Sequence, residues 1–500
     1  MYEKGIGMKS EKLEVFPQLD TSISWREKNY EYEEIVKRIN VIKTIFDNLG
    51  IEENSLIGLL LERSEWQVIC PISVLNYNCG YVPLNISWPV ERIRKILKQT
   101  NLSVIIIDKQ KYIENKKDIR NYKCKIVYEN IAILVRGKYE KNKKLKNVAY
   151  IIFTSGTTGE PKGVVISRSA LQRFKENYEN RMLLQRGKSI LSLAEYSFDM
   201  FVPEGILALS WGIKIILAET MDIINPRRIE RILLNHKPDY MQITPSALNL
   251  IFTIDTELSG LKSISKLMVG AERFSEELFI KTKRYFKGNI YNLYGPTEAT
   301  VWCCGGNITN DKYVNIGVEL GDCKVAIIDE ERKEDCEKGE ICISGMQLAD
   351  GYWNNEEETK NKFYFVNGER FYRSGDIGYR DKDGKIICLG RKDDQIKLHG
   401  YRIELAEIES ITRKIEGVVD ALASVAGEEE EKLILFLIVN EQFKEVDFWD
   451  DLGKSLPAYE MPVKYFLVDE FAYSENGKVN RKKMIEIMKE SDGNEFWKSC

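Results

Sequence analysis

The sequence predicts an α/β protein with two domains, a large N-terminal domain containing a doubly wound parallel sheet and a small α+β C-terminal domain. The first observation is a succession of strand and helix patterns between residues 56 and 108. The second is the length of 500 residues, which suggests about three structural units and fits a large composite domain together with a small one. The third is the charged, Gly-punctuated stretch from Gly390 to Glu404, which is typical of a boundary between domains.

The N-terminal patterns alternate strictly between strand and helix. An apolar run from Leu56 to Leu61 predicts a strand, the spacing from Glu65 to Asn78 a helix, and Tyr81 to Leu84 another strand. A helix with Pro89 near its first turn follows, and Ser103 to Asp108 predicts a third strand. This order favours parallel strands with ligands at their carboxyl ends.

Later segments continue the pattern. Residues 169–181 and 404–414 predict helices, and the hairpin from Tyr379 to Leu389 turns at Asp383-Gly384, a strong two-residue turn signal. Further strands are expected within 189–193, 238–246, 266–272, 290–294 and 432–439. We therefore expect an N-terminal core over residues 1–392 and a C-terminal domain over 393–500.

Charge and hydropathy argue against nucleic-acid and membrane partners. The formal net charge is -4 and 43% of the residues are hydrophobic, as in ordinary soluble proteins. The basic stretches Lys109 to Lys125 and Arg136 to Lys146 are expected to be solvated loops between strands. Neither a long apolar run nor an N-terminal apolar region is found. We expect a cytoplasmic protein without nucleic-acid or membrane partners.

Histidine and cysteine usage narrows the chemistry further. The two histidines, His236 and His399, leave little material for a Ser/His/Asp hydrolase or a His-ligated metal site. Ten scattered cysteines lack metal-ligand spacing and are expected to be reduced core residues.

The segment TSGTTGEPKG, residues 154–163, predicts a phosphate-binding loop between two buried strands. Its glycines let backbone N–H groups converge, its hydroxyls add donors, and a lysine behind Pro161 adds charge. A flexible hairpin is the alternative for such a Gly/Ser/Thr run, and the lysine favours phosphate. The expected binding residues are Thr154, Ser155, Gly156, Thr157, Thr158, Gly159 and Lys162.

Other polar residues follow predicted strands. Asp199 could bind an ammonium group or cap a helix, and its position alone favours neither. Tyr294 and Glu298 flank a Gly-Pro turn, where an aromatic ring can stack on a base and a carboxylate can hold Mg²⁺ beside phosphates. Asp376 could accept ribose hydroxyls or form an Asx turn.

Six segments resemble, in order, the motifs of the adenylate-forming superfamily, which includes acyl-CoA synthetases, luciferases and the adenylation domains of nonribosomal peptide synthetases. They are TSGTTGEPKG, YSFDMFVPEGILALSWG, YGPTEAT, YRSGD, the charged stretch from Gly390, and NGKVNRK. The resemblance implies the acyl-adenylate synthetase fold with a mobile C-terminal lid domain, and ATP and Mg²⁺ as cofactors.

The resemblance also implies roles for single residues. It places Tyr294 against the adenine, Thr297 near the α-phosphate and Glu298 on the magnesium ion. It assigns Asp376 to the ribose and Arg391 to the ribose or a phosphate. Asp393 would be the hinge and Lys478 the catalytic lysine. By itself, a lysine on the Asn-Gly-Lys turn at Lys478 is a solvated residue. If it stabilises the transition state, its removal should cost about 10² to 10³ in adenylation rate.

The implied substrate is an amino acid. In the members of this family that activate amino acids, an Asp at the position of Asp199 holds the α-amino group, and the acyl-CoA synthetases usually lack it. The side-chain pocket would be lined by Met200, Pro203, Gln242, Met268, Gly270, Leu293, Val301 and Trp302. Since none of these residues is charged, we predict a neutral amino acid, with a possible hydrogen bond from Gln242 and a depth limited by Trp302.

The predicted activity is that of an AMP-forming ligase of the nonribosomal peptide synthesis type. It would release pyrophosphate and pass the amino acid to the phosphopantetheine thiol of a separate carrier protein, because only 18 residues follow Lys482, too few for a carrier domain. Alternatives are a D-alanine–carrier protein ligase, which resembles the chain around His399, an acyl- or aryl-CoA synthetase, and a non-catalytic nucleotide-binding module.

Overall fold

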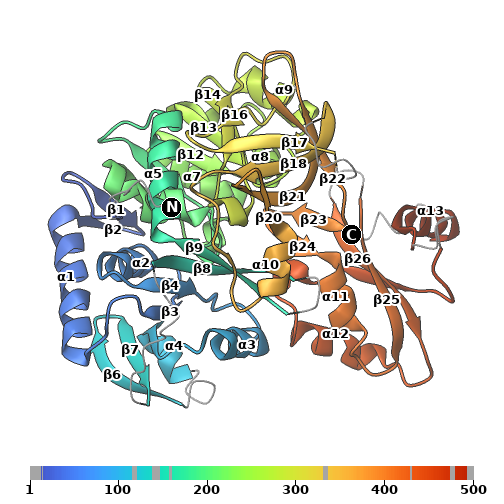
Figure 1. Cartoon of the computed structure of the whole chain (residues 1–500), viewed down its shortest axis with the longest axis horizontal. Helices are drawn as coiled ribbons and strands as arrows, with labels where there is room; N and C mark the ends of the chain where they lie inside the picture. Colours follow the sequence, from blue (N-terminus) through green and yellow to red (C-terminus); the bar gives the residue numbers. More distant parts are fainter. Residues whose placement is uncertain are drawn as a thin grey trace, which may run out of the picture. The chain divides into compact units, whose positions relative to one another are not determined.

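The chain forms two compact units, and Figure 1 labels many of their helices and strands. This computed structural model describes residues 13, 15–114, 121–137, 147–156, 160–223, 225–329, 336–427, 431–472 and 479–492. The first unit comprises Met1–Ile86, Gln99–Phe153 and Gly163–Lys392. The second comprises Ser87–Lys98, Thr154–Lys162 and Asp393–Cys500.

The predicted β-α-β-α-β succession forms the centre of an eight-stranded sheet. Its strand order is β19-β9-β8-β4-β3-β5-β7-β6, and β3 pairs in parallel with both β4 and β5. The strands are β3 (Leu56–Leu60), β4 (Gly80–Pro83), β5 (Val104–Asp108), β6 (Tyr122–Tyr128), β7 (Ile131–Arg136), β8 (Val148–Thr154), β9 (Lys162–Ser167) and β19 (Gly351–Tyr352).

A second, nine-stranded sheet has the order β16-β15-β14-β13-β12-β10-β11-β1-β2. Its neighbours from β14 to β1 all pair in parallel, while β2, β15 and β16 are antiparallel. The strands are β1 (Ser22–Trp25), β2 (Lys28–Glu31), β10 (Ser189–Ser192), β11 (Lys214–Leu217), β12 (Tyr240–Ile243), β13 (Lys266–Gly270), β14 (Asn289–Tyr294), β15 (Cys304–Asn307) and β16 (Val318–Glu319). The parallel centres of these two sheets confirm the predicted fold class.

A five-stranded sheet completes the first unit. It contains β17 (Lys324–Ile328), β18 (Lys338–Ser344), β20 (Phe363–Val366), β21 (Glu369–Arg380) and β22 (Ile386–Arg391). The predicted hairpin joins β21 to β22 through Asp383-Gly384, where Gly384 has a φ of +80°. Glycine suits this left-handed conformation because it carries no Cβ.

Short polar residues begin several helices of the first unit. Ser167 accepts a hydrogen bond from Ala170 N at 3.1 Å, and Thr244 precedes Pro245 at the first helical position. The helices are α1 (Tyr32–Leu49), α2 (Trp66–Asn76), α4 (Lys109–Glu114), α5 (Arg168–Met182), η1 (Val202–Ile206), η2 (Ala208–Trp211), α6 (Thr220–Ile223), α7 (Pro226–His236), α8 (Pro245–Phe252), η3 (Ser259–Ser263), α9 (Glu276–Tyr285), η4 (Thr297–Ala299) and α10 (Glu356–Lys362).

The second unit has its own α+β core. A three-stranded sheet of β25 (Val418–Ala426), β26 (Lys432–Val439) and β27 (Lys464–Leu467) packs with a two-stranded ladder of β23 (Gln395–Leu398) and β24 (Tyr401–Glu404). The helices that follow residue 393 are α11 (Leu405–Thr412), α12 (Glu445–Gly453), η5 (Ala458–Glu460) and α13 (Arg481–Asp492), and α3 (Val90–Thr100) contributes most of its length to the same unit.

The basic stretch Lys109 to Lys125 differs from its prediction as a loop. Its first residues form α4, and strand β6 begins at Tyr122. Lys123 and Lys125 lie on the exposed face of that strand, where side chains alternate between core and solvent. The lysines obscured this period-two pattern in the sequence. Residues 115–120, and 138–146 of the other basic stretch, lie outside the described residues.

The nine described cysteines are all free thiols, as expected. No helix within the described ranges combines the length and the apolar character that crossing a membrane requires.

Candidate functional site

Four adjacent parallel strands of the first unit bring the predicted pocket residues together. Strands β10, β12, β13 and β14 are neighbours, so their carboxyl ends lie along one edge of the sheet. Gln242 is the direct cross-strand partner of Met268. Gly270 is in the same way the partner of Leu293. The sheet register therefore joins four of the eight predicted lining residues in two pairs.

Trp302 closes this group from the segment that follows the Gly-Pro turn. Its indole Nε1 donates a hydrogen bond to Gln242 Oε1 at 2.9 Å. A Cβ on Gly270 would lie 2.8 Å from Trp302 Cη2, so only glycine lets the ring approach the strand this closely. The lining residues are uniformly buried, namely Met200, Pro203, Gln242, Met268, Gly270, Leu293, Val301 and Trp302.

Asp199 follows β10 and is half-buried. Its backbone oxygen accepts from Val202 N at 2.9 Å, and the helical turn η1 is capped at Phe201, two residues beyond it. Asp199 is therefore not the cap of this turn. Burial raises the pKa values of the Tyr81 and Tyr150 hydroxyls, and the negative charge of Asp199 acts in the same direction on both, after that of Tyr81 in the case of Tyr150.

Sequence reasoning missed Glu204, a fully buried acid within η1. It accepts from Ala194 N at 2.6 Å and from Gln242 Nε2 at 3.3 Å. Burial raises the pKa of its carboxyl to about 7, although the Ala194 N–H, the Arg63 guanidinium and the Ser192 hydroxyl act in the opposite direction. The available signal was a single acid within the apolar run 200–209.

The nucleotide residues of the first unit also meet. Tyr294 Oη donates to Asp376 Oδ2 at 2.6 Å, and Arg391 Nη1 lies 3.2 Å from Asp376 Oδ1. Burial, followed by the charge of Asp376, raises the pKa of Tyr294 and keeps its hydroxyl a neutral donor. A buried carboxylate held by two donors retains lone pairs for two ribose hydroxyls, so these residues fit a nucleoside.

Glu298 lies in η4, which begins at the half-buried Thr297. The Glu298 side chain is buried, and its Oε1 accepts a hydrogen bond from Tyr352 Oη at 2.7 Å. Sequence reasoning assigned no role to Tyr352. Over the described residues, no group of three or more His, Cys, Asp and Glu residues could hold a metal ion. A single oriented carboxylate fits Mg²⁺, which takes one or two carboxylates together with phosphate oxygens.

The described part of the predicted phosphate loop belongs to the second unit. Ser155 Oγ donates to Arg402 O at 2.7 Å, and Gly156 N–H donates to Glu407 Oε2 at 2.8 Å. Thr154 Oγ1 lies 3.5 Å from the carbonyl oxygen of Lys162, which begins β9. Thr157, Thr158 and Gly159 lie outside the described residues. The Gly156 amide is thus able to bind an anionic oxygen, here a carboxylate.

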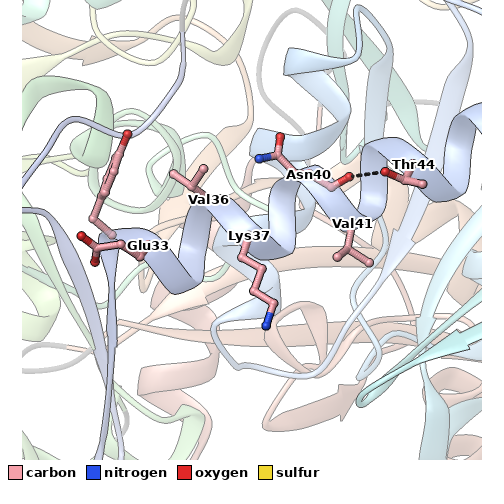
Figure 2. Close-up of a pocket in the computed structure, with 7 residues that line it drawn as sticks. Glu33, Val36, Lys37, Asn40, Val41 and Thr44 are labelled. Carbon is pink, nitrogen blue, oxygen red and sulfur yellow. Dashed lines mark hydrogen bonds between the residues drawn. The ribbon is translucent and has the colours of Figure 1, made fainter.

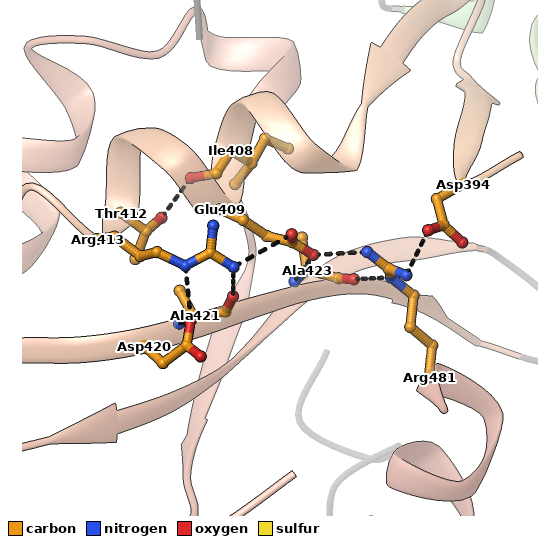
Figure 3. Close-up of polar contacts among 9 residues, drawn as sticks. All are labelled: Asp394, Ile408, Glu409, Thr412, Arg413, Asp420, Ala421, Ala423 and Arg481. Carbon is orange, nitrogen blue, oxygen red and sulfur yellow. Dashed lines mark hydrogen bonds and ion pairs between the residues drawn. The ribbon is translucent and has the colours of Figure 1, made fainter. Parts of the chain in front are cut away.

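The predicted hinge residue Asp393 is where the chain re-enters the second unit. Its neighbour Asp394 lies 2.7 Å from Arg481, the first residue of α13, and Arg481 also contacts Glu409 (Figure 3). The predicted catalytic residue Lys478 lies outside the described residues. The segment just after it is therefore tied to the segment just after the hinge.

A depression of about 510 Å³ runs along α1 between Tyr32 and Thr44 (Figure 2). Its lining comes from this single helix and includes none of the predicted site residues. We do not count it as part of the site.

Comparison with known proteins gives a family and relatives. The sequence profile of the AMP-binding enzymes matches residues 11–353. Gramicidin S synthase 1 of Brevibacillus brevis is 31% identical over 472 residues, which cover 91% of this chain and 42% of that protein. Tyrocidine synthase 1 of Brevibacillus parabrevis is 28% identical over 491 residues, 95% of this chain and 44% of that protein. The chain spans less than half the length of both relatives.

Among solved structures, an adenylation domain of Vibrio cholerae in complex with glycyl-adenosine-5'-phosphate has the same fold, with a TM-score of 0.83. It is 19% identical, and the match covers 98% of this chain and 99% of the other. The acyl-adenylate synthetase fold predicted from the sequence motifs is thus confirmed.

Proposed function

We propose, since this chain belongs to the family of AMP-binding enzymes, that it activates a neutral amino acid as an aminoacyl adenylate and then forms a thioester. The observation that carries this proposal is the group of buried, uncharged residues gathered around the carboxyl ends of β10, β12, β13 and β14, with the half-buried Asp199 next to Met200 in the chain. The glycyl adenylate bound by the Vibrio cholerae domain is the same kind of intermediate, an amino acid joined to AMP.

Asp199 would bind the α-ammonium group of the substrate. An ammonium needs an anionic or carbonyl partner when it leaves water, and Asp199 is a half-buried carboxylate next to lining residue Met200. The lining residues themselves carry no charge, so the pocket favours a substrate with a neutral side chain. A fatty or aryl acid would leave Asp199 without this partner.

In the first half-reaction, a carboxylate oxygen of the amino acid attacks the α-phosphorus of ATP. The bond from that phosphorus to the bridging oxygen breaks, and pyrophosphate leaves. Both reactants are anions, so the chain's task is to position them and to offset their charge. Tyr294 and Asp376 would hold the nucleoside, Thr297 and the loop 154–162 the phosphates, and Lys478 would stabilise the transferring oxygens. Glu298 would hold Mg²⁺, which neutralises phosphate charge when bound.

In the second half-reaction, the thiol sulfur of a phosphopantetheine group attacks the activated carbonyl carbon. A carbon–sulfur bond forms, the bond between the carbonyl carbon and the AMP phosphate oxygen breaks, AMP leaves, and the thiol proton passes to solvent. We propose a separate carrier protein as the source of this thiol. Support comes from a solved NRPS protein containing adenylation and PCP domains.

The decisive experiment is amino-acid-dependent exchange of labelled pyrophosphate into ATP, across the proteinogenic amino acids, D-alanine, and several aryl and fatty acids. We expect exchange with one or a few neutral amino acids. Exchange with D-alanine alone would indicate a D-alanine–carrier protein ligase. Exchange only with acids that lack an amino group would instead indicate an acyl- or aryl-CoA synthetase, and no exchange with any acid would contradict the proposal.

A further inference from the structure

Three side chains of the first unit form a continuous hydrogen-bonded chain, and two of them, Trp302 and Gln242, are proposed lining residues of the amino acid pocket. Trp302 Nε1 donates to Gln242 Oε1 at 2.9 Å, and Gln242 Nε2 donates to Met200 O at 2.8 Å and to Glu204 Oε2 at 3.3 Å. Because an indole N–H can only donate and a carbonyl can only accept, these partners fix which end of the amide faces which neighbour.

Gln242 therefore has no donor left for a substrate. Both of its amide hydrogens are directed at Met200 and Glu204, and the side chain is 1% exposed. A bound side chain that needed a donor from Gln242 would have to break one of these bonds inside the core. The arrangement favours apolar side chains over those that must accept a hydrogen bond at this end.

Glu204 anchors the chain at its other end. Ala194 N and Ser192 Oγ donate to Oε1 at 2.6 and 3.1 Å, while Gln242 donates to Oε2. Three donors around one buried carboxylate stabilise its ionised form. Ala194 lies in the segment between β10 and Asp199, so this one carboxylate joins that segment to β12.

We propose that Glu204 is a positioning residue for the amino acid pocket, holding the Gln242 amide and, through it, the Trp302 indole against Gly270. This inference rests on the proposed function and names a determinant of its substrate class. With the indole fixed, the pocket has a rigid end and accepts short apolar side chains. Without the Glu204–Gln242 bond, the amide can rotate and the indole can move, so longer or polar side chains enter.

The Glu204–Gln242 hydrogen bond responds to protonation of Glu204. A protonated carboxyl must donate its proton to an acceptor, whereas the groups around Glu204 are mainly donors. Burial raises the pKa of Glu204 to about 7. The titratable groups that face it are Arg63, whose guanidinium donates to Ser192 O and Ala194 O, and Tyr178, whose pKa the Glu204 charge helps to raise. Burial lowers the pKa of Arg63, while the charges of Glu195, Glu204 and Asp222 act in the opposite direction. Tyr178 stays neutral and Arg63 stays charged, so neither of these two groups changes charge near pH 7.

The first test is Glu204→Gln, measured by pyrophosphate exchange. The new side chain can still accept from Ala194 N, but its amide faces the amide of Gln242 as a second donor. We expect the amino acid KM to rise about tenfold, the ATP KM to change less than twofold, and selectivity against amino acids one or two carbons longer to fall about tenfold. Glu65→Gln is the matched control, because Glu65 is also buried in this unit, 3% exposed and paired with Arg38. It should alter stability without altering selectivity.

The second test needs no activity. The fluorescence of Trp302, taken as the difference between wild type and Trp302→Phe, should titrate with a midpoint near pH 7, and this titration should disappear in Glu204→Gln. If that variant does not fold, Gln242→Met breaks the same link and leaves the Ala194 and Ser192 bonds intact. Unchanged selectivity together with an unchanged Trp302 titration in either variant would overturn the inference. Wild type without any exchange would refute the proposed function, while the fluorescence titration would still decide the role of Glu204.

Discussion

Arg481 Nη2 lies 2.7 Å from Glu409 Oε1, and the same guanidinium lies 2.7 Å from Asp394 Oδ2 (Figure 3). Its Nε also donates to Ala423 O at 2.9 Å. One side chain at the start of α13 therefore holds together α11, β25 and the residue that follows the predicted hinge. The Glu409 carboxylate is 7% exposed, so its ion pair is largely shielded from water.

Arg481→Ala should destabilise the second unit by about 2 to 4 kcal/mol, because it leaves a largely buried carboxylate with fewer partners. Urea unfolding followed by circular dichroism would measure the loss. Lys482→Ala is the control, since Lys482 is exposed on the same helix. Equal stability of the two variants would contradict the structural role of Arg481.

Lys478→Ala should reduce pyrophosphate exchange by about 10² to 10³, because a cation that offsets charge in the transition state is lost. The KM values for ATP and amino acid should change little by comparison. Lys483→Ala, an exposed lysine further along, serves as the control. A similar rate for Lys478→Ala and wild type would exclude the catalytic role.

Asp199→Asn should weaken the use of amino acids by about tenfold to a hundredfold, the usual worth of a charge-assisted hydrogen bond to an ammonium group. The measurement is KM in pyrophosphate exchange for the preferred amino acid and for its analogue without the amino group. The preference between the two should narrow in the variant. Asp255→Asn, which removes a buried carboxylate that accepts from Gly260 N, should leave the preference unchanged.

Tyr352→Phe should raise the Mg²⁺ concentration needed for half-maximal exchange by about tenfold or more, because the hydroxyl orients Glu298 and partners of metal ligands have effects of this size. A titration with Mg²⁺ at saturating ATP would show it. Tyr313→Phe removes an equivalent phenol–carboxylate bond, to Asp381, and provides the comparison. Identical Mg²⁺ curves for both variants would count against Glu298 as the ligand.

The stability of wild type should fall relative to Glu204→Gln as the pH rises from about 5 to 8. The folded pKa, about 7, is above the ordinary value of 4.5. At a pH between these two values the Glu204 carboxyl is deprotonated in the unfolded chain but still protonated in the folded chain, so each rise in pH favours unfolding. The free energy of unfolding of wild type, compared with that of Glu204→Gln, should fall by about 3 kcal/mol in total and level off above pH 7. Thermal unfolding of both proteins across this range would reveal it, and parallel curves would contradict the raised pKa.

The sequence predicted strands, turns and the polar residues at strand ends, because these follow from local periodicity and turn chemistry. Gln242, Met268 and Trp302 were identified through resemblance alone, and the structure adds the register and hydrogen bonds that join them. Glu204 and Tyr352 were missed because each acts through a partner distant in sequence, which no local pattern records. Strand β6 was missed for another reason, since its lysines face solvent and masked the alternation.

The pairing of β1 with β11 has a consequence for how the chain acquires its structure. Ile23 lies opposite Ile215, and most of the eight-stranded sheet is encoded between them. During synthesis the edge of β1 that pairs with β11 remains without this partner while most of the eight-stranded sheet is made. Non-local pairings of this kind slow folding and leave strand edges open to other chains. Substitutions in β11 that weaken its pairing with β1 should therefore increase aggregation and chaperone dependence during expression, although β1, the strand left unpaired, lies far earlier in the chain.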